Sequence, residues 1–320
     1  MIVRWGLEEL ADVLDELEIR RPLLVASRRW SDEALPIRPA ATWTQVPSHR
    51  TAEAATEAGD GVVALGGGSA IDLGKAISAE VDVPVVSVPT TYAGAEWTPY
   101  FGVRDPDRKM RGGGAGAHLA AAVYEPRLTL TLSREETVGT ALNALAHCAE
   151  ALYVQGRNEE ADAHALEGAR LIGEWLPQVV ERPDDLEART RLLEGAMHAG
   201  MALGKSMLAL GHAMAQAVGG RYGLPHGRLN AICLPAALRF NAPLDPDAVR
   251  RLGEALHAGD PAARVEELAA LSGPTRLRAL GVPEEDLDEL ATAAASRPGN
   301  RANPRPATPA EIRALLRSVW

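Results

Sequence analysis

Three histidines and one asparagine lie at spacings that would let them share one small volume. Asn143 and His147 are one helical turn apart, which places both side chains on the same face of a helix. His226 follows His212 after a stretch long enough for a helix to end near Gly219 and for the chain to turn back. Imidazole and amide groups gathered in this way could donate hydrogen bonds and protons to an anionic substrate, or could bind a metal ion.

A metal site built from these residues would lack its usual anion. Fe²⁺ and Zn²⁺ accept imidazole nitrogens, but a carboxylate normally helps to hold their charge. Asn143 stands where that carboxylate would be expected, and its neutral amide oxygen is a weak ligand. The candidate metal ligands are Asn143, His147, His212 and His226. We expect the other histidines to be packed or surface residues: His49, His118, His164, His198 and His257.

A glycine turn earlier in the chain is typical of phosphate binding. A predicted strand at 61–65 runs into Gly66-Gly67-Gly68-Ser69, and a predicted helix follows. Glycines let a backbone approach phosphate oxygens, and the helix N-terminus offers N–H groups and partial positive charge. The candidate cofactor-binding residues in this turn are Gly66, Gly67, Gly68, Ser69 and Asp72. A tight turn without a ligand remains an alternative, because the Gly-x-Gly-x-x-Gly fingerprint is absent.

A second polar turn follows the next predicted strand, at residues 89–96. Because loops at the carboxyl ends of parallel strands line one edge of a sheet, we expect Thr90 and Thr91 to face the glycine turn. Tyr92 in the same turn is a candidate for substrate contact. Ser27, after an earlier strand, leaves room for the 2′-phosphate of NADPH, which an acidic residue there would disfavour.

The first part of the chain alternates strands with helices. We expect strands at 22–26, 61–65, 85–88 and 121–124, helices at 7–17, 51–58 and 71–80, and a hairpin or flap within 105–116. This order predicts an α/β domain at residues 1–132, built on a parallel sheet.

From residue 133 onward the pattern is helical, beginning with capping-box spacing between Ser133 and Glu136. We expect helices at 137–154, 160–181, 184–218, 227–240, 247–256, 261–271, 284–296 and 309–319, with a loop at 298–306. The simplest organisation is an all-helical second domain at 133–320, with the cleft between the domains as the default ligand site.

Composition excludes several classes of function. The net charge of −10 argues against nucleic acid and anionic membranes as partners. Two cysteines are too few for a disulfide framework, and no apolar run is long enough to cross a membrane. The N-terminus lacks the apolar stretch of a signal peptide. We therefore expect a cytoplasmic protein that acts on a small molecule.

Taken together, these motifs resemble the iron-containing alcohol dehydrogenase superfamily, and within it the maleylacetate reductase branch. The similarity covers nearly the whole chain. It is carried by residues 66–75 (GGGSAIDLGK), 88–99 (VPTTYAGAEWTP), 124–130 (YEPRLTL), 142–153 (LNALAHCAEALY), 224–231 (LPHGRLNA) and 303–306 (NPRP). The resemblance implies a nucleotide-binding domain followed by a helical catalytic domain, the architecture shared with dehydroquinate synthase, and often a homodimer.

The resemblance also assigns roles. Gly67, Gly68 and Ser69 would contact the pyrophosphate of NADH or NADPH, and Thr90 and Thr91 the nicotinamide side. In metal-dependent members Asn143, His147, His212 and His226 would match the ligands of Fe²⁺ or Zn²⁺, with aspartate at the first position. Reductases of the maleylacetate branch resemble this chain in having asparagine there and are thought to need no metal.

Some positions depart from that branch. Gln216 occupies a position where both branches usually have histidine, and Asp72 and residues 225–230 look more like the alcohol dehydrogenases.

The sequence therefore predicts an NAD(P)H-dependent reductase that passes hydride to an enoate conjugated to a ketone, giving a 3-oxo acid such as 3-oxoadipate in aromatic-compound catabolism. His212 and His226 would donate hydrogen bonds and a proton, and His147 and Asn143 would orient them. Candidate cations for the substrate carboxylates are Lys109, Arg111 and Arg228.

Three alternatives stay open. The first is a metal-dependent alcohol dehydrogenase for small alcohols and aldehydes. The second is a lyase of the dehydroquinate synthase kind, and the third is a non-catalytic nucleotide-binding protein.

Overall fold

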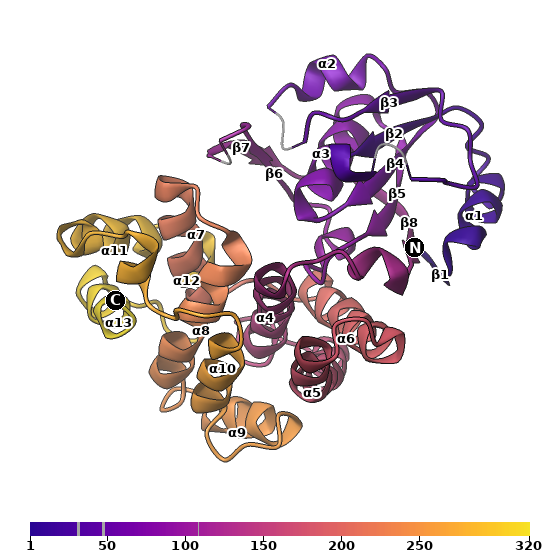
Figure 1. Cartoon of the computed structure of the whole chain (residues 1–320). Coiled ribbons are helices and arrows are strands. Elements are labelled where there is room, and N and C mark those ends of the chain that lie inside the picture. The colour runs from indigo at the N-terminus through magenta and orange to yellow at the C-terminus, as the bar shows by residue number, and fades with distance from the viewer. Residues whose placement is uncertain (31–32, 47–48, 108) are drawn as a thin grey trace. The chain divides into compact units, whose positions relative to one another are not determined.

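The structure is a computed structural model that describes residues 1–30, 33–46, 49–107 and 109–320. The chain forms two compact units, Met1–Thr131 and Leu132–Trp320. The first is an α/β unit on a parallel sheet and the second is helical, so the predicted fold class is confirmed (Figure 1). No helix among the described residues is both long and apolar enough to span a membrane.

A six-stranded sheet forms the centre of the first unit. Its strands are β1 (Ile2–Trp5), β2 (Pro22–Ala26), β3 (Ala41–Trp43), β4 (Gly61–Gly66), β5 (Pro84–Pro89) and β8 (His118–Tyr124), in the order β1-β8-β5-β4-β2-β3. All neighbouring pairs are parallel. The four predicted strands are present, whereas β1 and β3 were not predicted because they are short edge strands without a buried apolar run.

Helices cover both faces of this sheet because successive side chains of each strand point to opposite sides. Val63 and Leu65 of β4 pack on one face in a cluster with α1 (Leu10–Glu16). Val62 and Ala64 pack on the other face in a cluster with α2 (Thr51–Ala55) and α3 (Gly68–Val81). Burial on both faces keeps the carboxyl ends of β2, β4 and β5 at one edge of the sheet.

The predicted hairpin is present, displaced toward the N-terminus. Strands β6 (Phe101–Arg104) and β7 (Met110–Gly114) pair antiparallel. Residue 108 and the side chain of Arg111 lie outside what the structure describes, so the candidate role of Arg111 as a cation is not addressed.

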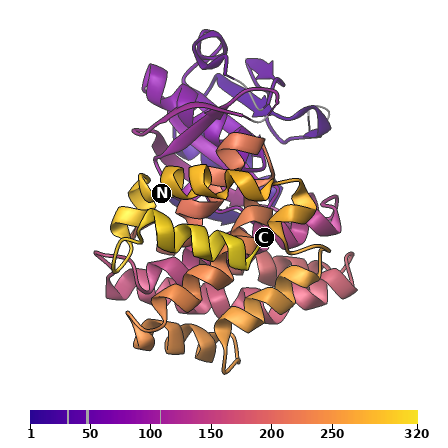
Figure 2. The ribbon, with the colours of Figure 1, turned by 90° about the vertical axis from the view of Figure 1, so that its left-hand side faces the viewer.

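The second unit is a bundle of helices. They are α4 (Arg134–Ala151), α5 (Glu159–Glu181), α6 (Leu186–Gly204), α7 (Leu210–Tyr222), α8 (His226–Asn241), α9 (Pro246–Ala255), α10 (Pro261–Ala270), α11 (Leu287–Ala295), α12 (Pro298–Ala302) and α13 (Pro309–Ser318). The predicted capping box closes the start of α4 between Ser133 and Glu136. One apolar core joins α7 and α8 to α11 and α13, the last of which is the yellow helix in Figure 2.

Two predictions about this unit are wrong. The single helix expected at 184–218 is two helices, α6 and α7, separated by residues 205–209. The break coincides with a buried carboxylate from α4 that accepts backbone N–H groups at the start of α7. The expected loop at 298–306 begins instead with the short helix α12, which starts with a proline as helices often do.

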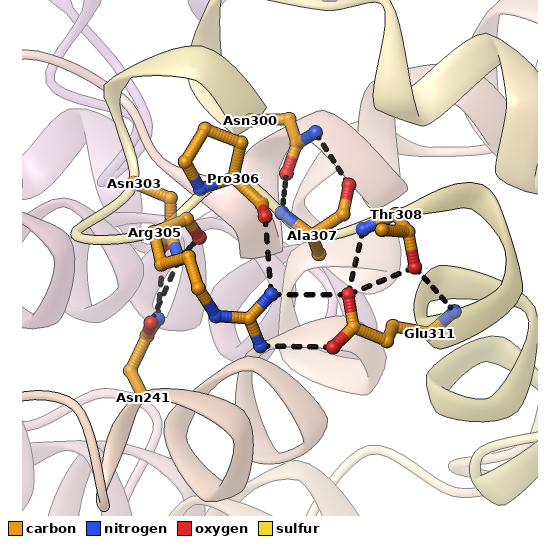
Figure 3. A network of polar contacts seen from close by, with 8 residues as sticks. All are labelled: Asn241, Asn300, Asn303, Arg305, Pro306, Ala307, Thr308 and Glu311. Carbon is orange, nitrogen blue, oxygen red and sulfur yellow. Dashed lines mark hydrogen bonds and ion pairs between the residues drawn. The ribbon is translucent and has the colours of Figure 1, made fainter.

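A network of buried amides fastens α12 to its neighbours (Figure 3). Asn303, just after α12, exchanges two hydrogen bonds with Asn241 of α8, of 3.0 and 2.8 Å. Asn300 donates to the carbonyl oxygen of Ala307 and accepts from its N–H, both at 2.9 Å. All three asparagines are buried, so α12 is held between α8 and the start of α13.

Candidate active site

The structure brings the three predicted imidazoles of the helical unit together. His147 comes from α4, His212 from α7, and His226 is the first residue of α8. The ring centroids of His147 and His212 are 4.9 Å apart, and those of His212 and His226 are 5.6 Å apart. Gly227 lets α8 approach α4, because a Cβ there would lie 2.4 Å from the carbonyl oxygen of Gly139.

Two asparagines link the outer histidines. Nδ2 of Asn143 lies 3.4 Å from Nε2 of His147, and Oδ1 of Asn143 accepts from Nδ2 of Asn230 at 2.6 Å. Nδ2 of Asn230 also lies 3.1 Å from Nε2 of His226. Asn230 was not predicted as a site residue, although it lies four residues after His226 on α8 and so repeats the spacing of Asn143 and His147.

A buried glutamate that the sequence analysis missed orients the central histidine. Glu150 of α4 is fully buried, and its carboxylate accepts three hydrogen bonds: from Ala209 N at 2.6 Å, His212 N at 3.0 Å and His212 Nδ1 at 2.7 Å. Ala209 is the N-cap of α7 and provides no side-chain cap of its own. Glu150 therefore caps α7 and, through the same carboxylate, holds the His212 ring.

This contact fixes which nitrogen of His212 is available. A carboxylate can only accept, so Nδ1 is the nitrogen that donates to Glu150, and in the neutral ring Nε2 keeps its lone pair. Nε2 of His212 and Nδ1 of His147 are buried and have no hydrogen-bond partner among the described residues. Unpartnered buried imidazole nitrogens are costly unless a ligand or a solvent molecule uses them, so they mark this cluster as a binding site.

Burial also sets the charge of the cluster. The pKa of His147 is held well below its usual value, first by burial and then by repulsion from charge on His212 and His226. The His147 ring is therefore neutral near neutral pH.

The donor set does not fit a divalent metal. No carboxylate replaces Asn143, and the amide oxygen of Asn143 already accepts a short hydrogen bond from Asn230. Within the described ranges, no group of three or more His, Cys, Asp or Glu side chains is arranged to hold a metal ion. The candidate metal site at Asn143, His147, His212 and His226 therefore has no part in the proposed reaction.

The predicted nucleotide site lies in the first unit, where two polar turns meet. The N–H of Thr90 donates to the carbonyl oxygen of Gly66 at 3.0 Å, which joins the turn after β5 to the turn after β4. Gly67 is required by this approach, because a Cβ there would lie 2.9 Å from Cγ2 of Thr91. Oγ1 of Thr91 is buried without a partner among the described residues, so it can bond a ligand.

The helix after the glycine turn begins earlier than predicted. Gly67 is the N-cap of α3 and has no side-chain cap, so the N–H groups of Gly68 and Ser69 lie in the first turn. Such a terminus suits a phosphate. Ser27 directly follows β2, the neighbour of β4, and is partly exposed at the same edge of the sheet.

Two predicted site residues have structural partners instead. Asp72 lies beyond the first turn of α3, pairs with Lys75 at 2.9 Å, and accepts from the N–H of Gly102 at 3.2 Å. It therefore ties α3 to β6, and a ribose contact stays a prediction. Tyr92 is fully buried and its hydroxyl donates to Oγ1 of Thr129 at 3.2 Å, so a substrate contact would require its ring to be uncovered.

Another histidine pair lies away from the cluster. Nδ1 of His164 on α5 and Nδ1 of His198 on α6 are 2.9 Å apart, and both residues are partly exposed. The expectation of surface or packing roles for these two residues missed this hydrogen bond.

Comparison with known proteins places the whole chain among one set of relatives. The family described as "Iron-containing alcohol dehydrogenase" matches residues 3–124, and "Fe-containing alcohol dehydrogenase family, C-terminal" matches residues 137–320. A maleylacetate reductase from Burkholderia cepacia is 37% identical over 331 aligned residues, covering 98% of this chain and 93% of that protein.

Solved structures of similar proteins match this chain over its full length. The crystal structure of a maleylacetate reductase from Agrobacterium tumefaciens is 32% identical, with a TM-score of 0.90, covering 100% of this chain and 95% of the other. The crystal structure of a putative alcohol dehydrogenase from Ralstonia eutropha JMP134 is 35% identical, with a TM-score of 0.92 and the same coverage of both chains.

Replacing Glu150 by glutamine should loosen the start of α7. We expect Glu150→Gln to lower the free energy of unfolding by about 2 to 4 kcal/mol, because an amide cannot accept all the hydrogen bonds that the carboxylate accepts. Amide exchange at Ala209 and His212 should accelerate. The exposed Glu159→Gln is the matched control, and unchanged exchange at Ala209 in Glu150→Gln would contradict the capping role.

The neutral state of His147 predicts a dependence of stability on pH. Because the folded state has the lower pKa, the unfolded state takes up the proton first, and stability should fall as the pH drops below about 6.5. We expect the loss of unfolding free energy between about pH 8 and about pH 5.5 to be smaller in His147→Asn than in the wild type. The unfolding free energies are measured by urea titration. An equal loss in the variant and the wild type would show that His147 does not take up a proton on unfolding.

Proposed function

This chain belongs to the iron-containing alcohol dehydrogenase family, and from that premise we propose that it reduces maleylacetate, or a closely related 4-oxo-enoate, to the saturated 3-oxo acid. It is an NAD(P)-dependent oxidoreductase of the maleylacetate reductase type. The observation that carries the choice of substrate is the histidine cluster. In this cluster His147 and His212 are buried, the amide of Asn143 rather than a carboxylate lies beside His147, and one nitrogen of each of these two rings has no partner among the described residues.

The proposed reaction passes hydride from C4 of the reduced nicotinamide to the alkene carbon that is β to the ketone. The electron pair of the double bond moves toward the ketone and gives an enolate, while the cofactor is oxidised to NAD(P)⁺. A proton added to the neighbouring carbon completes the saturated 3-oxo acid. The cluster must therefore stabilise negative charge on the enolate oxygen and then supply a proton.

His212 is suited to supply the proton. A proton carried at Nε2 makes its ring doubly protonated, and the Glu150 carboxylate faces that charge 2.7 Å from Nδ1. His226 is the second proposed donor, and His147 and Asn143 orient the rings through their mutual contact. Glu150 does not touch the substrate in this account and acts through His212.

We propose that residues 1–131 bind NADH or NADPH and that residues 132–320 bind the substrate. The pyrophosphate would lie at the start of α3, on the N–H groups of Gly67, Gly68 and Ser69. The free hydroxyl of Thr91 would bond the nicotinamide half of the cofactor. Thr90 mainly joins the two turns.

We further propose a homodimer in the cytoplasm. The resemblance to this family supports the dimer. Two buried free cysteines support a reducing compartment, and burial raises the pKa of the Cys233 thiol to about 12, which makes it unreactive.

The substrate can be tested directly with purified protein from which metal has been removed by chelation. We expect consumption of NADH or NADPH on addition of maleylacetate, with 3-oxoadipate as product, because no step of the proposed mechanism uses a metal. Product identity is checked by mass spectrometry, and Fe²⁺ or Zn²⁺ is added in parallel samples.

Other outcomes point to the alternatives. Turnover of simple alcohols or aldehydes only after Fe²⁺ or Zn²⁺ is added, with none of maleylacetate, would indicate a metal-dependent alcohol dehydrogenase. Tight cofactor binding without turnover of any enoate or carbonyl compound would indicate a non-catalytic nucleotide-binding protein.

The role of Thr91 predicts a loss of cofactor affinity. We expect Thr91→Val, which keeps the shape and removes the hydroxyl, to raise the Kd for the reduced cofactor by about 2- to 10-fold, the effect of one neutral hydrogen bond. Thr56→Val, at an exposed threonine of the same unit, is the control. Equal affinities for Thr91→Val and wild type in fluorescence titrations would remove Thr91 from the site.

A further inference from the structure

One partly buried arginine of the helical unit has no counter-charge. The guanidinium of Arg297, the N-cap residue of α12, donates to the side-chain oxygen of Gln216 at 3.4 Å and to its backbone carbonyl oxygen at 3.0 Å. Its Nε is buried and unpartnered, and Arg297 forms no ion pair with any carboxylate of the described residues. Burial alone lowers the pKa of Arg297, because no acidic group offsets the desolvation.

The cations predicted from sequence differ from Arg297 in this respect. Arg228 pairs with Glu135, which already neutralises its charge. Lys109 is exposed in the first unit, and its backbone N–H donates to the carboxylate of Asp105. A guanidinium has five N–H donors, and a partly buried one held only by neutral acceptors favours binding of an anion.

Arg297 lies beside the histidine cluster along α7. Gln216 is one turn after His212, about 6 Å along the helix axis, and therefore on the same face. Gly220 continues that face, and a Cβ there would lie 3.5 Å from Nη2 of Arg297. From Leu210 to Gly219 every residue of α7 is buried except Gln216, so this face reaches the surface where Arg297 lies.

The fold holds Arg297 firmly in this position. The backbone of Gly299 packs against the carbonyl oxygen of Ala209, at the start of α7. The amide network around Asn300 and Asn303 fastens the other side of α12 to α8 and α13 (Figure 3). Because α12 is held on both sides, the backbone of Arg297 loses little conformational freedom when the side chain binds a ligand.

We propose that Arg297, together with the side-chain amide of Gln216, binds a carboxylate of the substrate and so selects dianionic over neutral enoates. This inference rests on the proposed function and names the group that recognises the charged end of the substrate. Nη1 and Nη2 present the paired donors that a carboxylate accepts, and the NH₂ group of Gln216 adds a third. Because Gln216 is neutral, it leaves the positive charge of Arg297 uncompensated. An acidic residue at this position would cancel that charge.

The experiment compares kcat/KM for maleylacetate with kcat/KM for its neutral dimethyl ester. We expect Arg297→Met to lower the ratio of the two values by about 10- to 100-fold, the effect of losing a charge-assisted hydrogen bond, mainly through a higher KM for the dianion. Arg297→Lys keeps the positive charge but loses the paired N–H donors of the guanidinium, so it should lower the ratio by less. Added guanidinium ion should partly restore maleylacetate turnover by Arg297→Ala.

Arg301→Met is the matched control, because Arg301 lies on the same short helix, is exposed, and has a side chain that donates to the carbonyl oxygen of Ser296. Thermal unfolding of each variant checks that α12 is intact, and Arg297→Lys carries the test if Arg297→Met does not fold. An unchanged ratio in a folded Arg297 variant, with an active wild type, overturns this inference and leaves the proposed function standing. A wild type that does not turn over maleylacetate overturns both.

Discussion

The buried carboxylate of Glu150 is the constraint on which the helical unit depends. It accepts two backbone N–H groups at the start of α7 and the ring N–H of His212. A carboxylate without water around it must find such donors, and here they come from one helix end. The same hydrogen bonds therefore cap α7, which begins after the break that follows α6, and hold the Nδ1 side of the His212 ring toward Glu150. Without Glu150, His212 would have neither its position nor its tautomer fixed.

The cluster and Arg297 have complementary electrostatic roles. Burial keeps the His147 ring neutral, so this ring acts through hydrogen bonds rather than as a fixed charge. Arg297 bonds Gln216, which lies one helical turn after His212 on α7, and it contributes a positive charge with no acidic partner among the described residues. An anionic substrate would be drawn to that charge, while its reacting carbons face groups able to stabilise a developing enolate and return a proton. A divalent metal is not needed for either role, and the donors around Asn143 do not suit one.

Periodicity and local motifs predicted much of this structure. The alternation of strands and helices and the capping box at Ser133 follow from short-range patterns. The gathering of His147, His212 and His226 was inferred from helical spacing together with the resemblance to the family. The residues that were missed depend on contacts distant in sequence. Glu150 lies within the quoted motif at 142–153, but its role depends on Ala209, which is distant in the chain. Arg297 was not predicted to have a role, and it lies between the helix predicted at 284–296 and the loop predicted at 298–306. The helix α12 that follows it is short and is stabilised by buried amides rather than by helical propensity. Tyr92 and Asp72 were predicted to contact ligands from their residue types, and the structure gives each a partner within the first unit, so their ligand contacts stay predictions.

The tautomer of His212 is the most direct test of this account. Long-range ¹H–¹⁵N spectra of protein labelled in histidine, with His212→Gln used for assignment, report which ring nitrogen carries the proton. In the neutral ring we expect the proton at Nδ1 rather than at Nε2, because Nδ1 lies 2.7 Å from the carboxylate of Glu150. A ring protonated at Nε2 instead would mean that Glu150 does not hold it, and would contradict the arrangement from which the proposed chemistry follows.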